Sequence, residues 1–249
     1  MIRPLGWLLV AIRLGLMLAW LGLCIVLYYI WRTLRPTNPW PSVFLGGIAW
    51  IAGVEVTRTG TQTPGHHGLR GAFLLANHVS WIDIPAIAGT TGSAFVAHDG
   101  LAAIGPLRWL CDMNDTVFVA RHDRASVGHQ VEQVREAIRD TGALTIFPEG
   151  TTSDGTDLLP FKSSLLSALD PIPAGIAVQP IWLDYGAEAG DIAWVGEEPG
   201  LDNFLRILAR ARPVALTLHF LPPLKGEALT NRKTLATAAR AAIVEAMNR

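Results

Sequence analysis

The chain of 249 residues contains, close to its N-terminus, a run of 18 uncharged residues from Leu14 to Trp31. A helix needs about 20 apolar residues to cross the hydrocarbon layer of a membrane, so this run is at the threshold for spanning. Arg13 precedes the run and could extend its side chain to the headgroup layer. Arg32 and Arg35 follow the run directly, which favours a cytoplasmic position for the rest of the chain. The alternative is a core helix of a soluble protein.

A second apolar stretch, Val43 to Val54, has only 12 residues and is too short to span a membrane. We expect it to form an interfacial or half-inserted helix. Five of the nine tryptophans lie in the first 50 residues, and tryptophan favours the membrane interface. The sequence therefore predicts a membrane anchor over residues 1–53, which either spans or embeds, followed by one further domain over residues 54–249.

The charge distribution divides the chain in the same way. Residues 1–70 carry six arginines and one glutamate, whereas the remainder has a net charge of −6. The basic part is also the most apolar part, which indicates an anionic membrane surface and not nucleic acid as its partner. Two cysteines, Cys24 and Cys111, form neither a disulfide framework nor a metal-ligand spacing, which is typical of a reducing compartment.

Short apolar runs alternate with helical patterns after residue 54. This alternation predicts an α/β fold with a layered, mixed sheet flanked by helices and with ligand-binding groups at the strand ends. Pro180 interrupts one of the runs, which suggests an edge strand or a bulge. The predicted strands are 54–59, 72–76, 93–97, 116–120, 143–147, 176–183 and 214–220, and the predicted helices are 100–113, 127–138, 201–211 and 231–247.

The strand over residues 72–76 ends at Asn77, and His78 and Asp83 follow it. Neighbouring side chains on one helix are three or four residues apart, so a spacing of five suits a turn that leads into a helix. Asp83, in the first helical turn, could then bond one ring nitrogen of His78 and leave the other nitrogen free as a base. The rival interpretation is a structural pair beside a strand.

Two more polar clusters follow later strands. Arg121 and Arg124 come after one strand, and the segment from Glu149 to Thr152 comes after another. Arginine offers a planar fork for phosphate or carboxylate, and glycine lets backbone amides approach an anion. A base combined with such groups suits an anionic substrate that carries a hydroxyl to be activated.

Four blocks of the sequence resemble, in order, the motifs of the glycerolipid acyltransferases, typified by 1-acylglycerol-3-phosphate acyltransferase. The histidine–aspartate block, Asn77 to Asp83, is similar to their first motif, and Phe118 to Arg121 to their second. Phe147 to Thr152 resembles the third motif almost letter for letter, and Val178 to Leu183 resembles the fourth. The resemblance covers roughly residues 54–225.

The resemblance implies a mechanism. His78 would take the proton from an acceptor hydroxyl, which attacks the thioester carbonyl of acyl-CoA or acyl-acyl carrier protein, and Asp83 would orient the ring. Backbone amides near the His78 turn are candidate donors to the oxyanion. The thioester is a co-substrate, and neither a cofactor nor a metal ion is expected.

The resemblance also assigns acceptor binding, chiefly of its phosphate, to the second and third motifs. A glutamate cannot itself attract a phosphate, so we expect Glu149 to bond an acceptor hydroxyl or to buttress its loop. Lys162 matches a basic position after the third motif, whereas Arg124 either contacts the substrate or lies at the solvated start of a helix. The predicted substrate-binding residues are Arg121, Arg124, Glu149, Gly150, Thr151 and Lys162.

The sequence thus predicts a membrane-associated lysolipid O-acyltransferase on the cytoplasmic face of the cell membrane, with membrane lipids and an acyl thioester as partners. The leading acceptor is 1-acylglycerol-3-phosphate, which gives phosphatidate, and the alternative acceptor is a lyso-ornithine lipid. Many family members carry lysine and glutamate where this chain has His98-Asp99, and a basic residue and glycine where it has Ser163-Ser164. Both departures lie near the expected acceptor site. An alternative of another class is a non-catalytic lipid-binding protein of the membrane.

Overall fold

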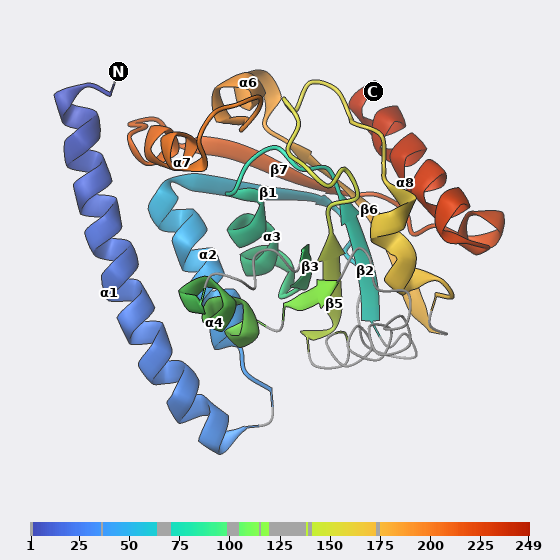
Figure 1. Ribbon diagram of the computed structural model, residues 1–249, viewed down its shortest axis with the longest axis horizontal. Coiled ribbons are helices and arrows are strands. Elements are labelled where there is room, and N and C mark those ends of the chain that lie inside the picture. Colours follow the sequence, from blue (N-terminus) through green and yellow to red (C-terminus); the bar gives the residue numbers. More distant parts are fainter. Residues whose placement is uncertain are drawn as a thin grey trace.

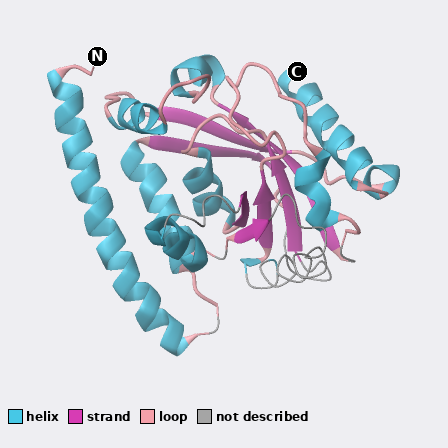
Figure 2. Ribbon diagram, in the orientation of Figure 1, coloured by secondary structure: helices cyan, strands magenta, loops and turns pink. Residues whose placement is uncertain are grey.

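In the described part of the chain, seven strands form one sheet in the spatial order β1-β7-β6-β2-β5-β3-β4 (Figures 1 and 2). Neighbouring strands run parallel except β6 and β7, which run antiparallel. The predicted α/β class with a mixed sheet is confirmed. The computed structural model describes residues 2–35, 37–63, 71–98, 105–114, 116–119, 138, 141–172 and 175–249. The strands are β1 (Val54–Gly60), β2 (Gly71–Ala76), β3 (Ala94–His98), β4 (Val117–Val119), β5 (Ala143–Ile146), β6 (Ile176–Asp184) and β7 (Val214–Phe220).

Helices cover both faces of this sheet (Figure 1). In β2 every residue is buried, and successive side chains alternate between two apolar clusters. Leu74 packs in the cluster that α2, α3 and α7 close, and Phe73 packs in the cluster that α8 closes. The continuous apolar run of β2 follows from burial on both faces. The helices are α1 (Pro4–Leu34), α2 (Trp40–Ala52), α3 (Asp83–Thr91), α4 (Gly105–Met113), α6 (Ala189–Ile192), α7 (Gly200–Leu208) and α8 (Arg232–Met247), with 3₁₀ turns at Ser163–Leu169, Gly186–Glu188 and Gly226–Leu229.

Strand β6 lies inside the sheet, between β2 and β7, so the edge position that Pro180 suggested is wrong. The antiparallel ladder with β7 begins at Ile181, and the missing N–H of Pro180 falls just outside it. The carbonyl of Pro180 still accepts a hydrogen bond, from the amide of Leu221. The interior position of β6 brings its carboxyl end beside that of β2.

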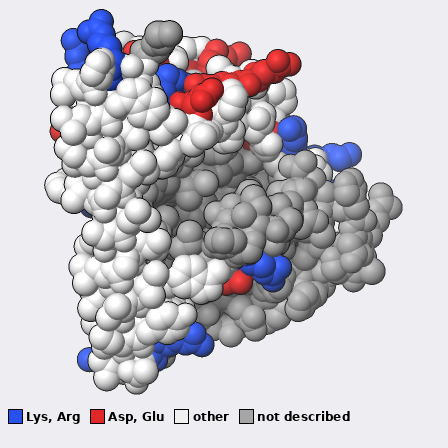
Figure 3. Space-filling view, turned by 60° about the vertical axis from the view of Figure 1, so that its left-hand side comes forward, with Lys and Arg blue, Asp and Glu red and all other residues white. Residues whose placement is uncertain are grey.

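Helix α1 has 31 residues and extends about 46 Å along one side of the molecule (Figure 1). Among the described helices it is long and apolar enough to cross a membrane. About half of its large side chains are exposed, and Figure 3 shows a broad uncharged surface with basic side chains above and below it. Such a surface suits contact with lipid. The exposed apolar side chains of α1 are Leu5, Trp7, Leu8, Ile12, Leu16, Leu18, Leu23, Val26, Tyr29, Ile30 and Leu34.

Arg13 points into the protein, so the expected reach toward the headgroups is wrong. Its guanidinium donates hydrogen bonds of 2.9 Å to the carbonyl oxygens of Leu208 and Arg210, at the C-terminal end of α7. The last carbonyls of a helix lack partners within the helix, and a cation is favourable there. Further along α1, Trp20 donates to the carbonyl of Phe44 in α2. These contacts attach α1 to the remainder of the protein, and the domain boundary at residue 54 stays a prediction.

Candidate active site

The turn between β2 and α3 carries the predicted base. Asn77 fixes this turn to the neighbouring strand, because its side chain accepts from the amide of Leu183 (2.7 Å) and donates to the carbonyl of the same residue (3.1 Å). His78 follows in the turn, and Asp83 is the first residue of α3. This is the arrangement that the five-residue spacing predicts.

The side chains of His78 and Asp83 lie in contact. Nδ1 of His78 is 2.8 Å from Oδ2 of Asp83, whose side chain is fully buried, while the histidine side chain is 17% exposed. The amides of Val79 and Ser80 donate to the same oxygen, at 2.6 and 2.9 Å. An ionised carboxylate can only accept, so the proton of the neutral ring lies on Nδ1. Nε2 therefore keeps the free lone pair, which is the condition for a general base.

Tyr185 is a further partner of Asp83 that the sequence analysis missed. It follows β6 directly, and its hydroxyl donates a hydrogen bond to Oδ1 of Asp83. Burial, together with the negative charge of Asp83, raises the pKa of the Tyr185 hydroxyl well above its usual value. The hydroxyl therefore stays protonated as a donor. The sequence feature that could have indicated Tyr185 as a site residue is its position two residues after the fourth motif.

The strand on the other side of β2 positions the histidine ring. Phe147 follows β5 and stacks on the His78 ring, with 4.1 Å between the ring centroids and 17° between the planes. Ser153, in the loop after β5, donates to the carbonyl of His78 from both its amide (2.7 Å) and its hydroxyl (3.2 Å). The ring of His78 is thus fixed by Phe147, in the segment that resembles the third motif, and its carbonyl by Ser153, which directly follows that segment.

Glu149 lies beneath the turn, with its side chain buried. Its Oε1 accepts from the amide of His78 (2.7 Å) and its Oε2 accepts from the amide of Leu159 (3.0 Å). Burial raises the pKa of this carboxyl to about 7, against the opposing effect of these two hydrogen bonds. Of the two expected roles, this geometry is that of a buttress for the loop.

Gly150 has a φ of +69°, a region that glycine adopts far more readily than other residues. A Cβ atom at this position would come within 2.9 Å of Leu165 and within 3.3 Å of Nζ of Lys162. The backbone amide of Lys162 donates to the carbonyl of Pro148 (2.8 Å), which closes the loop. The structure therefore brings Lys162 beside the segment of Glu149, Gly150 and Thr151.

The remaining predicted site residues, Arg121 and Arg124, lie outside the described residues. Their role in substrate binding stays a prediction, as do the roles of Thr151 and Lys162, which are exposed. Within the described ranges, no three His, Cys, Asp or Glu side chains lie close enough to share a metal ion.

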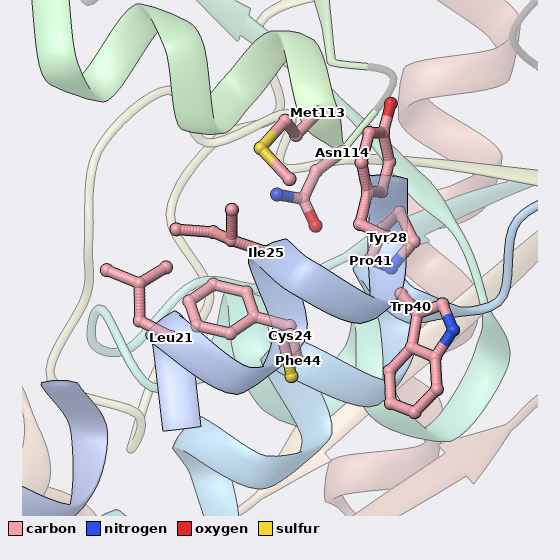
Figure 4. A pocket seen from close by; sticks show the side chains of 9 residues that line it. All are labelled: Leu21, Cys24, Ile25, Tyr28, Trp40, Pro41, Phe44, Met113 and Asn114. Atoms are coloured by element: carbon pink, nitrogen blue, oxygen red, sulfur yellow. The ribbon is translucent and has the colours of Figure 1, made fainter. Parts of the chain in front are cut away.

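Two described cavities lie away from the His78–Asp83 pair. A larger cavity of about 710 Å³ opens at the amino ends of β3 and β5, where Arg32 and Arg35 contribute to its lining. A small apolar cavity lies among α1, α2 and α4 (Figure 4). The His78–Asp83 pair lines neither of them. The small cavity is lined by Leu21, Cys24, Ile25, Tyr28, Trp40, Pro41, Phe44, Met113 and Asn114.

The fold is shared with a protein of known structure. The crystal structure of the 1-acyl-sn-glycerophosphate acyltransferase from Thermotoga maritima superposes with a TM-score of 0.61, covering 98% of this chain and 97% of that one, at 19% sequence identity. Together with the oriented histidine, this fold defines an α/β protein with a His–Asp pair at the end of a central strand. The profile of the acyltransferase family matches residues 55–184, and the chain belongs to this family. The family that the resemblance predicted is thereby confirmed.

Curated relatives name two kinds of acceptor. A lyso-ornithine lipid O-acyltransferase of Rhodobacter capsulatus is 33% identical over 70% of this chain and 65% of its own length. A protein of the same name from Brucella abortus is 28% identical, over 82% of this chain and 81% of the relative. A 1-acyl-sn-glycerol-3-phosphate acyltransferase of Neisseria meningitidis is 34% identical over 55% of this chain and 51% of the relative. The match to the Rhodobacter protein thus covers slightly less than two thirds of that relative.

Proposed function

We propose that this protein is a membrane-associated lysolipid O-acyltransferase in which His78 is the general base. The observation that carries the proposal is the 2.8 Å contact between Nδ1 of His78 and the buried carboxylate of Asp83. This contact leaves Nε2 as the only ring nitrogen able to accept a proton. A base oriented in this way suits activation of a hydroxyl, and a protein that only bound lipids would not need it.

The reaction then follows in balanced steps. Nε2 of His78 takes the proton of the acceptor hydroxyl while the hydroxyl oxygen forms a bond to the thioester carbonyl carbon. The carbon–sulfur bond breaks as the carbonyl re-forms, and His78 returns the proton to the leaving thiolate. The products are the acylated lipid and the free thiol. General base catalysis of this kind contributes roughly 10²–10⁴-fold to the rate.

Asp83 assists because a positive charge develops on the ring. A buried carboxylate in contact with the imidazolium stabilises the ion pair that forms when His78 takes the proton. The amides of Val79 and Ser80 donate hydrogen bonds to this carboxylate, and the amide of His78 donates one to Glu149. None of these three amides is free to bind the oxyanion.

For the acceptor, a lyso-ornithine lipid is now the leading proposal, ahead of 1-acylglycerol-3-phosphate. The relatives that carry the lyso-ornithine name match more of this chain than the Neisseria relative does. The departures at Ser163-Ser164 also remove a basic residue expected beside a phosphate. The carboxylate of an ornithine headgroup could instead be bound by arginine. The phosphate-bearing acceptor remains the second candidate because of the Neisseria relative.

The membrane is the proposed location, through α1 and α2. The long exposed apolar surface of α1 favours contact with lipid, while its contacts with α2 and α7 favour a helix embedded beside the protein over one that spans alone. Arg32 and Arg35 at the end of α1 favour the cytoplasmic face.

Acyl transfer by washed membranes that contain the protein tests the proposed function. The membranes receive a labelled acyl thioester and either lyso-ornithine lipid or lysophosphatidate as acceptor. We expect label in the ornithine lipid, and loss of at least a hundredfold in the His78→Ala variant. His219→Ala is the matched control, because His219 also lies beside an aspartate, Asp184 at 3.5 Å. Full activity of His78→Ala, or no labelling of either acceptor, would contradict the proposal.

A further inference from the structure

The two carboxylate oxygens of Asp83 have different partners. Oδ2 accepts from the ring of His78 and from two backbone amides. Among the described residues, Oδ1 has a single partner, the hydroxyl of Tyr185. Water does not compete for this oxygen, because the Asp83 side chain is 0% exposed and Tyr185 is 4% exposed. A buried carboxylate oxygen that loses its donor is left with a large desolvation penalty.

The sheet places this hydroxyl beside the site. Strands β2 and β6 are parallel neighbours, with Ala76 paired to Ile181, so the segments that follow them leave the same edge of the sheet. Asn77 bonds both backbone groups of Leu183, which fixes the distance between the two segments. The pairing of β2 with β6 and the hydrogen bonds between Asn77 and Leu183 therefore position Tyr185 relative to His78.

We infer that Tyr185 is a positioning residue of the proposed acyltransferase. Its hydrogen bond fixes the orientation of the Asp83 carboxylate and weakens the electrostatic attraction between that carboxylate and the protonated ring of His78. This inference rests on the proposed function. A donor on Oδ1 withdraws negative charge from the carboxylate, so the carboxylate stabilises the imidazolium less than it would alone. The hydroxyl thus keeps the His78 ring oriented and still able to release its proton to the leaving thiolate.

Two other charged groups lie near the pair, and one of them, Glu149, interacts electrostatically with His78. Glu149 contacts the backbone amide of His78, and Lys162 lies beside Gly150. Neither has a hydrogen bond to Asp83 in the described structure. Tyr185→Phe keeps both residues, so their effect on His78 is common to the wild type and the variant. The raised pKa of Tyr185 agrees with this role, because a hydroxyl that does not ionise is a donor at every working pH.

The test is the pH–rate profile of the full chain in membranes, for the wild type and for Tyr185→Phe. We expect kcat to fall about tenfold in Tyr185→Phe, with KM for the thioester and for the lysolipid unchanged. The acidic limb of the kcat profile should move to higher pH by about half a unit to one unit, because the unopposed carboxylate retains the proton on His78 more strongly. Tyr29→Phe is the control, since Tyr29 is 47% exposed on α1. A merely structural role would lower kcat without moving the limb.

In a second measurement, the acidic limb is expected to shift in the opposite direction. This measurement does not depend on the folding of Tyr185→Phe. The chain has three tyrosines, so a Tyr28→Phe/Tyr29→Phe variant labelled with 3-fluorotyrosine carries the label at position 185 alone. The fluorinated hydroxyl is a stronger donor, and the acidic limb should move to lower pH. A limb that is unmoved, or that moves upward, in this protein overturns the inference while the proposed function stands. Absence of acyl transfer by the wild type overturns both.

Discussion

The backbone N–H of His78 donates a 2.7 Å hydrogen bond to Oε1 of Glu149, a buried carboxyl from a segment 71 residues further along the chain. The second oxygen of Glu149 accepts from Leu159, so the same carboxyl connects the turn that carries His78 with the loop after β5. The first and third motifs of the family are therefore parts of one hydrogen-bonded unit.

Glu149→Gln should remove a pH dependence of stability. The pKa of Glu149 is about 7 in the folded protein against 4.5 ordinarily, so between these values the folded protein retains a proton that the unfolded chain has released. The ionisation of this carboxyl therefore lowers the free energy of unfolding as pH rises from 4.5 to 7, by a total on the order of 3 kcal/mol. Glutamine does not titrate, so the variant should lack this decline. The free energy of unfolding in detergent, measured at pH 5 and at pH 8 for the variant and the wild type, tests this prediction.

The exposed Glu197→Gln is the control for the Glu149 measurement, and it should keep the decline of the wild type. An identical pH dependence in Glu149→Gln and in the wild type would show that Glu149 ionises in its ordinary range.

Asp83→Asn should lower kcat by about 10³-fold or more. An asparagine presents one acceptor oxygen in place of two and puts an NH₂ group beside donors, so the ring of His78 loses its orientation and its counter-charge. KM for the thioester should change little, because Asp83 is fully buried and does not reach a substrate. Steady-state kinetics in membranes provides both values. Asp184→Asn, beside His219, is the matched variant, and a loss below tenfold in Asp83→Asn would refute the orienting role.

Gly150→Ala should destabilise the protein by about 1–3 kcal/mol and reduce activity. The substitution adds an atom 2.9 Å from Leu165 at a backbone φ of +69°. Gly190→Ala provides the comparison, because a Cβ atom there meets nothing within 4 Å, and it should be neutral. Thermal unfolding and acyl transfer are measured side by side. Equal stability of the two variants would mean that the loop relaxes without cost.

Arg13→Gln should loosen α1 from the catalytic part without releasing the protein from membranes. The variant loses the hydrogen bonds to Leu208 and Arg210, whereas the exposed apolar side chains of α1 are unchanged. Hydrogen exchange should therefore accelerate at the C-terminal end of α7, and sedimentation with membranes should remain complete. Arg3→Gln, an exposed position before α1, should change neither. Release into the soluble fraction would show that Arg13 carries the attachment.

The sequence determined those features that depend on neighbouring residues. Apolar runs of strand length, alternating with helical patterns, predicted the α/β sheet, and the spacing of His78 and Asp83 predicted a turn that enters a helix. Both depend on periodicity and on chain stiffness over a few residues. These local properties can be recognised in the sequence without knowledge of tertiary contacts. The motifs also identified the family, because the chemistry of the site requires particular residue types at those strand ends.

Only the tertiary structure decided which distant groups meet. The partner of Asp83 at Tyr185 is 102 residues away, and the contact of Arg13 with the end of α7 joins residues 195 positions apart. The interior place of β6, against the expectation from Pro180, has the same origin, since strand order follows from burial on both faces and not from local propensity. Residue type shows what a side chain can donate or accept. Which group receives that bond depends on packing across the whole sheet.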